Sequence, residues 1–351
     1  MVHVALLLGC AVAIYLACEW FVNAVEWLGV RLRFGPIAVG TVLAAAGTAL
    51  PESVVTLVAV LFGDQHGDEI GVGAALGGPL VVGTIAYAVT GAMLLVVNRN
   101  RSDRFSTAPG GAPLPTEPAP AAGATGLDRV DHRRLGRDQV WFLAIFVVKV
   151  GLGLVAFAVK PWLGLLFFAA YGLYFWREVN ADGESADGEG LEPLKLQPNR
   201  TTPATAAVLV QTVATLALIF GASQLFVRQL EWAGPALGLP AVAVALLLSP
   251  VATELPEIMN AIIWVRQGKT ELATANISGA MMIQATVPSG IGLLFTPWLF
   301  DGPLLLAGAA TTASIVYLNW LFRTGRVTPL RLTGAGAFYV AFAIGLVVLL
   351  P

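Results

Sequence analysis

Charged residues are scarce in this chain. Asp, Glu, Lys and Arg make up only 12% of its 351 residues, whereas a soluble domain carries about 25%. Hydrophobic residues make up 57%, and the mean hydropathy is +0.77. This composition excludes an ordinary soluble domain and predicts an integral membrane protein. No basic patch with interleaved aromatic residues is present, so no nucleic-acid partner is expected.

Cysteine and histidine are also rare. Cys10 and Cys18 both lie in the first apolar segment, which excludes a framework of disulfides and predicts buried free thiols. The three histidines lie at the amino terminus or in expected loops, no His-Glu-x-x-His occurs, and no Asp falls within an expected span. These absences argue against an intramembrane metalloprotease or aspartyl protease, so neither enzymatic activity nor a cofactor is predicted.

Long apolar runs, by contrast, are abundant. The first has no cationic region before it, so it is expected to be a retained span and not a cleaved signal. Hydropathy predicts ten membrane spans, at Val4–Gly29, Pro36–Phe62, Ile70–Val97, Val140–Val159, Trp162–Trp176, Ala204–Leu230, Leu239–Val265, Leu272–Leu299, Gly302–Phe322 and Leu330–Leu350.

The remaining segments divide the chain into regions. Ser102–Leu127, rich in Ala, Pro, Gly and Thr, is expected to be a disordered inner loop, and the acidic Ala181–Glu192 is expected to join the two halves. An acidic run can bind regulatory calcium, but a solvated run is the commoner outcome. The predicted regions are a first half with three spans at 1–98, a cytoplasmic linker at 99–138, two spans at 139–178, an acidic linker at 179–203 and the second half at 204–351.

Basic residues indicate the orientation. If the amino terminus faces out, the inward loops hold 17 of the 20 Lys and Arg residues, and Lys160 alone lies in an outward loop. The positive-inside rule therefore predicts a multi-pass protein of the plasma membrane with both termini outside the cytoplasm.

A phrase of six residues occurs twice. Gly47–Glu52 reads Gly-Thr-Ala-Leu-Pro-Glu, and Ala252–Glu257 reads Ala-Thr-Glu-Leu-Pro-Glu, 205 residues later (257 − 52). The match at this offset needs no gap over Ala17–Ser53. Because the second copy comes five spans after the first, the two copies enter the membrane from opposite sides. The predicted fold is all-α, with ten transmembrane helices forming two inverted five-helix repeats whose helices are broken at the site.

Each copy places an acid beside a proline within an apolar run. An intramembrane acid is a functional-site hypothesis by default, and proline frees backbone carbonyls next to it. Thr48 and Thr253 precede Glu52 and Glu257 by four residues, which puts hydroxyl and carboxylate on one helix face. These hard oxygen ligands suit Ca²⁺, Na⁺ or Mg²⁺.

Two further side chains extend the predicted cation site. Glu254 adds a third acid, and Asn260, three residues after Glu257, can face the same way. Because one Ca²⁺ neutralises two carboxylates, the third needs a proton or another cation, and burial beside like charges favours the proton. An acid that alternates between metal and proton would couple cation transport to H⁺.

Other polar residues have plainer interpretations. A single Pro-Glu pair can be a packing device, although two copies in register favour a cation pathway. Glu26, Trp27 and Trp232 lie near span ends, where Trp anchors at the interface and acids are tolerated. Lys149 lies within a span, and is either an internal partner for an acid or a residue that snorkels to the membrane surface.

At these motifs the chain resembles the sodium/calcium exchanger superfamily, the Ca²⁺:cation antiporters. Its members carry two alpha repeats, each with a Gly-Thr-Ser-Leu-Pro-Glu-like motif and, in the next span, a Gly-Asn-x-x-Gly-Ser-Asn-like motif. The first motif is well kept here. The second departs from the pattern, reading Gly-Ala-Ala-Leu-Gly-Gly-Pro-Leu-Val-Val over 73–82 and Ala-Asn-Ile-Ser-Gly-Ala-Met-Met-Ile-Gln over 275–284.

The resemblance implies roles for particular residues. Glu52 and Glu257 would be the central metal carboxylates, Thr48 and Thr253 flanking ligands, and Gln284 and the carbonyl of Ala45 further ligands. The counterpart of Ala45 in the second repeat is Pro250, and Val82 and Gln284 stand where Asn or Asp is usual. Family serines that help to bind Na⁺ are replaced by Ala49, Gly78, Glu254 and Ala280.

The sequence therefore predicts a secondary antiporter that works by alternating access, with inorganic cations and the lipid bilayer as its partners and a monomer sufficient for function. Ca²⁺ is the favoured export and H⁺ or Na⁺ the counter-ion. The alternatives are an exchanger of Na⁺, K⁺ or Mg²⁺ on the same fold, and an uncoupled cation channel or sensor.

Overall fold

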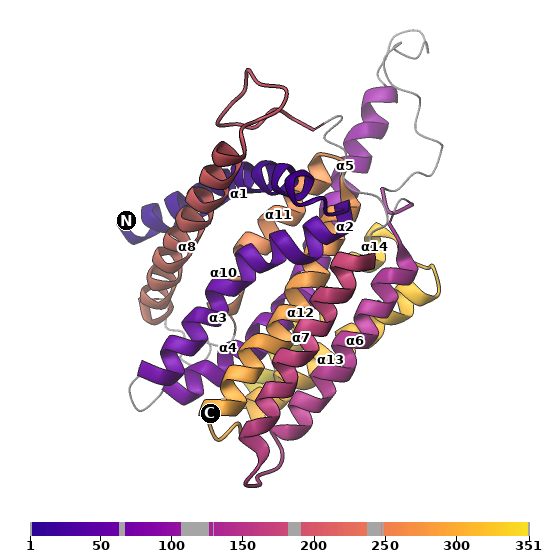
Figure 1. The fold of residues 1–351 in the computed structure, drawn as a ribbon. Coiled ribbons are helices and arrows are strands. Elements are labelled where there is room, and N and C mark those ends of the chain that lie inside the picture. The colour runs from indigo at the N-terminus through magenta and orange to yellow at the C-terminus, as the bar shows by residue number, and fades with distance from the viewer. Residues whose placement is uncertain are drawn as a thin grey trace.

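The computed structural model describes residues 2–62, 67–106, 126–128, 130–181, 191–236, 247 and 249–349, and all regular secondary structure within them is helical (Figure 1). The elements in chain order are α1 (Val2–Leu32), α2 (Pro36–Ala38), the π-helical stretch η1 (Val39–Ala44), α3 (Ala45–Phe62), α4 (Gly67–Val81), the π-helical stretch η2 (Val82–Ala86), α5 (Tyr87–Ser106), α6 (His132–Leu152), the 3₁₀ turn η3 (Lys160–Leu163), α7 (Gly164–Ala181), α8 (Thr205–Ala236), α10 (Ser249–Thr253), α11 (Leu255–Arg266), α12 (Thr270–Phe295), α13 (Gly302–Arg323), α14 (Pro329–Thr333) and α15 (Gly336–Leu349).

Each predicted span overlaps one or more of these helices. The second and third spans are each built from consecutive elements interrupted by a π-helical stretch, and the last consists of α14 and α15. Part of the predicted seventh span lies outside the described residues, and its remainder forms α10 and α11. By length and composition, six helices in the described part are able to cross a membrane.

Helix α12 lies at the centre of the bundle. It packs against α3, α4, α6, α7 and α11, and α1 and α8 lie side by side on one flank (Figure 1). The most apolar window of α12 is 89% buried, against 22% for the span made by α14 and α15. Glycine permits the close packing: a Cβ on Gly279 would lie 2.2 Å from the Thr41 carbonyl oxygen in η1.

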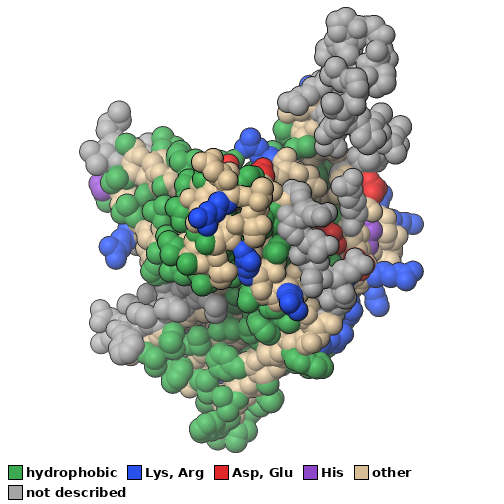
Figure 2. All heavy atoms as spheres, turned by 45° about the horizontal axis from the view of Figure 1, so that its top comes forward, with side chains coloured by type: hydrophobic (Ala, Val, Ile, Leu, Met, Phe, Trp, Pro, Cys, Tyr) green, Lys and Arg blue, Asp and Glu red, His purple; other side chains and the backbone are tan. Residues whose placement is uncertain are grey.

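The outer surface is apolar, as a lipid-facing surface must be. Many large hydrophobic side chains are exposed, including Val148 at 55%, Leu166 at 62% and Val347 at 65%. Figure 2 shows hydrophobic side chains over the lower part of the molecule and Lys and Arg over the end turned toward the viewer.

Helix α6 differs from the prediction by about two turns. It was expected at Val140–Val159, but it begins at His132 and ends at Leu152. The carboxylate of Asp131 caps it by accepting from the backbone N–H groups of Arg133 and Arg134, both at 3.0 Å. The helix therefore carries Asp138, which is 2% exposed, into the protein interior.

The linkers are described only in part. Helix α5 continues through Ser106, so the prediction that a disordered loop begins at Ser102 was wrong for residues 102–106. Residues 107–125 and 182–190 lie outside the described residues. The chain after 190 covers Trp27, whose indole N–H donates to the carbonyl of Glu192 at 2.9 Å. Trp27 is 4% exposed, so the prediction that it anchors at a lipid interface was wrong, whereas Trp232 is 47% exposed.

Candidate cation site

The second repeat breaks its helix at the acid-rich motif. Helix α10 ends at Thr253 and α11 starts at Leu255, with Glu254 between them as the residue before the helix. Pro256 lies in the first turn of α11, where its missing N–H removes no helical hydrogen bond. Glu257 also lies in this first turn, where the partial positive charge of the helix end favours a carboxylate.

In the first repeat, the departure from α-helical geometry lies about one turn before the position that corresponds to the break in the second repeat. The π-helical stretch η1 ends at Ala44, and α3 then continues through Pro51 without a break. The backbone of Glu52 lies on α3, but its side chain is outside the described part of the structure. Helix α3 contacts both α11 and α12, so the helices that carry the two Pro-Glu pairs meet in the bundle.

Each of the two threonines donates its hydroxyl hydrogen to a backbone carbonyl about one helical turn earlier. The hydroxyl of Thr48 donates to the carbonyl of Ala44 at 3.1 Å, and that of Thr253 donates to the carbonyl of Pro250 at 3.1 Å. A hydroxyl that donates its hydrogen to its own helix keeps its oxygen lone pairs for another ligand. Thr48 is 6% exposed.

Glu254 and Gln284 converge on Gly78. A Cβ placed on Gly78 of α4 would lie 2.9 Å from Oε1 of Glu254 and 3.2 Å from the amide carbon of Gln284. The side chains of Glu254 and Gln284 are 0% and 1% exposed. The structure therefore brings three separate elements, α4, the α10–α11 break and α12, to one buried polar point.

Two asparagine amides lie in the same interior. Asn260 of α11 and Asn276 of α12 are each 0% exposed, and no described atom makes a hydrogen bond with the amide oxygen or nitrogen of either. Buried amides without partners are costly unless a ligand satisfies them. Asn260 was predicted as a site residue. Asn276 was not, although it occupies the asparagine position of the second motif.

Helix α1 covers both motifs. A Cβ on Gly47 would lie 2.7 Å from the ring of Phe21, and the thiol of Cys18 lies 3.8 Å from the carbonyl oxygen of Pro256. Cys10 and Cys18 are buried free thiols, as predicted. Ala45 is also fully buried, and its N–H donates to the carbonyls of Gly40 and Val42 in η1.

The acids whose side chains are described do not form a complete metal cage on their own. Among the described residues there is no group of three or more His, Cys, Asp or Glu side chains that could hold a metal ion. The predicted cage requires Glu52 as well, so carbonyl, hydroxyl and amide oxygens must supply the other ligands.

The family follows from a comparison with known protein families. A family model described as sodium/calcium exchanger protein matches residues 2–178 and 207–350. The chain belongs to the sodium/calcium exchanger family. As a member it is a secondary transporter that exchanges inorganic cations across a membrane and is not an enzyme. No curated protein sequence matches it.

Solved structures of the sodium-calcium exchanger NCX_Mj share the fold. The form soaked with 2.5 mM Na⁺ and 0.1 mM Ca²⁺ is 16% identical and has a TM-score of 0.70, with 97% of each chain covered. The form soaked with 10 mM Na⁺ and zero Ca²⁺ is 15% identical, with the same TM-score and coverage. The likeness confirms the predicted fold of ten helices in two inverted repeats.

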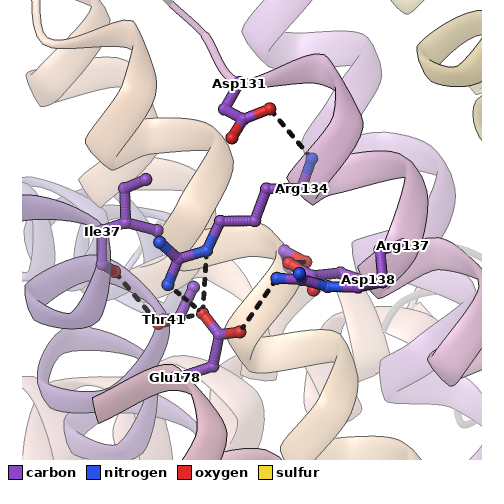
Figure 3. A network of polar contacts seen from close by, with 8 residues as sticks. Ile37, Thr41, Asp131, Arg134, Arg137, Asp138 and Glu178 are labelled. Carbon is purple, nitrogen blue, oxygen red and sulfur yellow. Dashed lines mark hydrogen bonds and ion pairs between the residues drawn. The ribbon is translucent and has the colours of Figure 1, made fainter. Parts of the chain in front are cut away.

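A buried ion-pair network in this exchanger was not predicted (Figure 3). The guanidinium of Arg134 donates to Oε2 of Glu178 at 2.5 Å, and the Thr41 hydroxyl lies 3.5 Å from the same oxygen. The hydroxyl of Ser278 in α12 donates to Asp138 at 3.2 Å. The network joins α6 and α7 to η1 and α12. The signal in the sequence was the capping residue Asp131, which places Arg134 and Asp138 inside a helix and not in a loop.

Proposed function

We propose that this antiporter exports Ca²⁺ from the cytoplasm in exchange for H⁺, and that the buried polar point between its two repeats is the Ca²⁺ site. Glu52 and Glu257 bind the metal. Thr48, Thr253, Asn260, Gln284 and the carbonyl of Ala45 supply further oxygen ligands. The observation that carries the proposal is the convergence of fully buried acid and amide side chains where the motif helices of the two repeats meet.

Proton coupling is supported by the ligands that this chain lacks. The resemblance assigns the family's serines a part in Na⁺ binding, and here those positions hold Ala49, Gly78, Glu254 and Ala280. Three of the replacements remove a hydroxyl ligand, and the fourth introduces an acid that can exchange a cation for a proton. Glu254 is the residue proposed to do so, because it is fully buried in a site with other acids.

The proposal includes an orientation in the plasma membrane. Arg31, Arg133 and Arg326 are exposed, and Figure 2 shows Lys and Arg side chains on the end of the molecule that is turned toward the viewer. The positive-inside rule supports the proposal that the basic end faces the cytoplasm. Both termini then lie outside. One chain contributes both half-sites, so a monomer suffices. The regions 1–98, 139–178 and 204–351 form the membrane domain, and 99–138 and 179–203 contain the two cytoplasmic linkers.

The test is radioactive Ca²⁺ flux in proteoliposomes with the purified chain. An imposed pH gradient is expected to drive Ca²⁺ uptake, and a Na⁺ gradient of the same size is expected to have little effect. Uptake driven by Na⁺ alone would replace H⁺ with Na⁺ as the counter-ion. Ca²⁺ movement that follows only its own gradient, with no response to either ion, would show a channel instead of an antiporter.

A further inference from the structure

Lys149 of α6 is a cationic side chain enclosed within the membrane bundle. It is 0% exposed, and its ammonium donates to the carbonyl of Ala75 at 2.7 Å and to the hydroxyl of Ser289 at 3.1 Å. The sequence left two interpretations open, a snorkelling residue or the direct partner of an acid. Full burial excludes the first, and the ligands that the structure shows are a carbonyl and a hydroxyl, not a carboxylate.

The carbonyl of Ala75 is available because of a proline. Pro79 lies inside α4, four residues after Ala75, and it has no N–H to donate to that carbonyl. Carbonyls freed in this way within membrane helices are typical cation ligands in transporters. The ammonium of Lys149 is therefore bound as a small cation would be, by a freed carbonyl and a serine hydroxyl.

Few other groups around Lys149 can stabilise its positive charge. The ring of Phe146 lies 4.8 Å from the ammonium, and the indole of Trp298 donates to the backbone carbonyl of Lys149 at 3.1 Å. Within the described residues, no carboxylate lies within ion-pair distance of Lys149. An enclosed charge must be balanced by opposite charge somewhere nearby, or its burial is strongly unfavourable.

The groups that bind the ammonium lie on two helices that also line the proposed Ca²⁺ site. Ala75 precedes Gly78 by three residues, roughly 4.5 Å along α4, and Gly78 is where Glu254 and Gln284 converge. Ser289 follows Gln284 by five residues on α12. The Lys149 ammonium is thus held by the same two helices, about one turn of α4 from the site.

We infer that Lys149 is a tethered counter-cation of the Ca²⁺ site. The inference rests on the proposed function. The carboxylates of Glu52, Glu254 and Glu257 carry three negative charges, so one Ca²⁺ leaves one of them unbalanced. The ammonium of Lys149 supplies the missing positive charge and makes the Ca²⁺-loaded site neutral, so no mobile cation besides Ca²⁺ is needed. A neutral loaded site can be enclosed without the cost of a net buried charge.

The inference predicts that charge, and not the shape of residue 149, controls Ca²⁺ movement. The measurement is exchange of radioactive Ca²⁺ for unlabelled Ca²⁺ across proteoliposomes at one pH, which needs no net proton movement. Lys149→Gln keeps a donor for the Ala75 carbonyl but removes the charge, so exchange is expected to slow at least about tenfold. Lys149→Arg keeps the charge, and its exchange rate is expected to stay closer to that of the parent.

The decisive variant combines Lys149→Gln with Glu254→Gln. This pair restores a neutral loaded site, so its exchange rate is expected to exceed that of the slower single variant by at least about threefold. A structural anchor at Lys149 would give no such recovery. Thermal unfolding and gel filtration in detergent verify that each variant is folded.

The outcomes separate the inference from the proposed function. Lys149→Gln at the parental rate, or a double variant no faster than the slower single variant, overturns the inference while Ca²⁺ transport stands. A parent chain that moves no Ca²⁺ under any gradient contradicts the proposed function, and the inference fails with it.

Discussion

At the residue scale, two departures from the family pattern explain each other. Glu254 and Gly78 both stand where the resemblance expects serine. In the structure, Oε1 of Glu254 occupies the space next to Gly78 that a side chain there would need. The longer acid and the absent side chain therefore fit each other, and Gly78 cannot gain a side chain unless the Glu254 carboxylate moves.

Gly78→Ser tests this pairing. The new Cβ would lie 2.9 Å from Oε1 of Glu254, so the carboxylate must move, and apparent Ca²⁺ affinity is expected to fall at least tenfold, about 1.4 kcal/mol. Affinity is measured from Ca²⁺-dependent uptake in proteoliposomes. Gly73→Ser is the matched control on the same helix, because a Cβ at Gly73 has no neighbour within 4 Å. Equal affinities for the two variants would contradict the account.

Single residues show where prediction from sequence ends. The sequence predicted Glu257 as a site residue because its Pro-Glu pair is repeated within an apolar run, and it predicted Glu254 and Asn260 because they lie beside that pair. Lys149 and Trp27, by contrast, make contacts with residues far away in the sequence. Lys149 donates to Ala75, 74 positions away, and Trp27 donates to Glu192, 165 positions away. No local pattern encodes contacts of that kind.

At the element scale, the buried ion pair of Arg134 and Glu178 holds α6 and α7 together beside η1. Both side chains are almost fully enclosed, with 9% and 3% of their surface exposed. Glu178 also faces Thr41, which belongs to the irregular stretch before the first motif. The network thus fixes the position of η1, on which the start of α3 depends.

Arg134→Ala is expected to destabilise the protein by about 3 kcal/mol, because it leaves the buried carboxylate of Glu178 with only the guanidinium of Arg137, at 3.9 Å, as a counter-charge. Unfolding in detergent measures the change. Arg133→Ala alters an exposed arginine one position earlier on α6, and is expected to change stability by less than about 0.5 kcal/mol. The Arg134→Ala/Glu178→Ala double variant should lose less than the sum of the single losses. Strictly additive losses would show that the two groups do not interact.

Helix boundaries could be predicted where an apolar run contains few charged residues. They were predicted less well where several charged residues lie inside a helix. Helices α1 and α13 begin and end within three residues of the prediction. Helix α6 was displaced because Arg134, Arg137 and Asp138 read as loop residues by hydropathy, whereas in the structure Arg134 and Asp138 are enclosed by other helices. The kind of break in each repeat also depends on packing: α3 passes through Pro51, and α10 stops before Pro256.

At the scale of the whole molecule, the inverted repeat and the basic end together support the proposed orientation in the membrane. Trp162 is 69% exposed in the segment between α6 and α7, and Arg326 is exposed at the other end of α13. In a background with Cys10→Ala and Cys18→Ala, a membrane-impermeant maleimide on intact cells is expected to label Trp162→Cys and not Arg326→Cys. Opening the cells should make Arg326→Cys reactive. The reverse pattern would place both termini inside.

The central claim is that both repeats contribute an acid to one Ca²⁺ site, and equilibrium binding of radioactive Ca²⁺ to the purified chain tests it most directly. Glu52→Gln and Glu257→Gln are each expected to abolish the same bound Ca²⁺ while the protein remains folded in detergent. A variant of either residue that binds and transports Ca²⁺ as the parent does would contradict the claim.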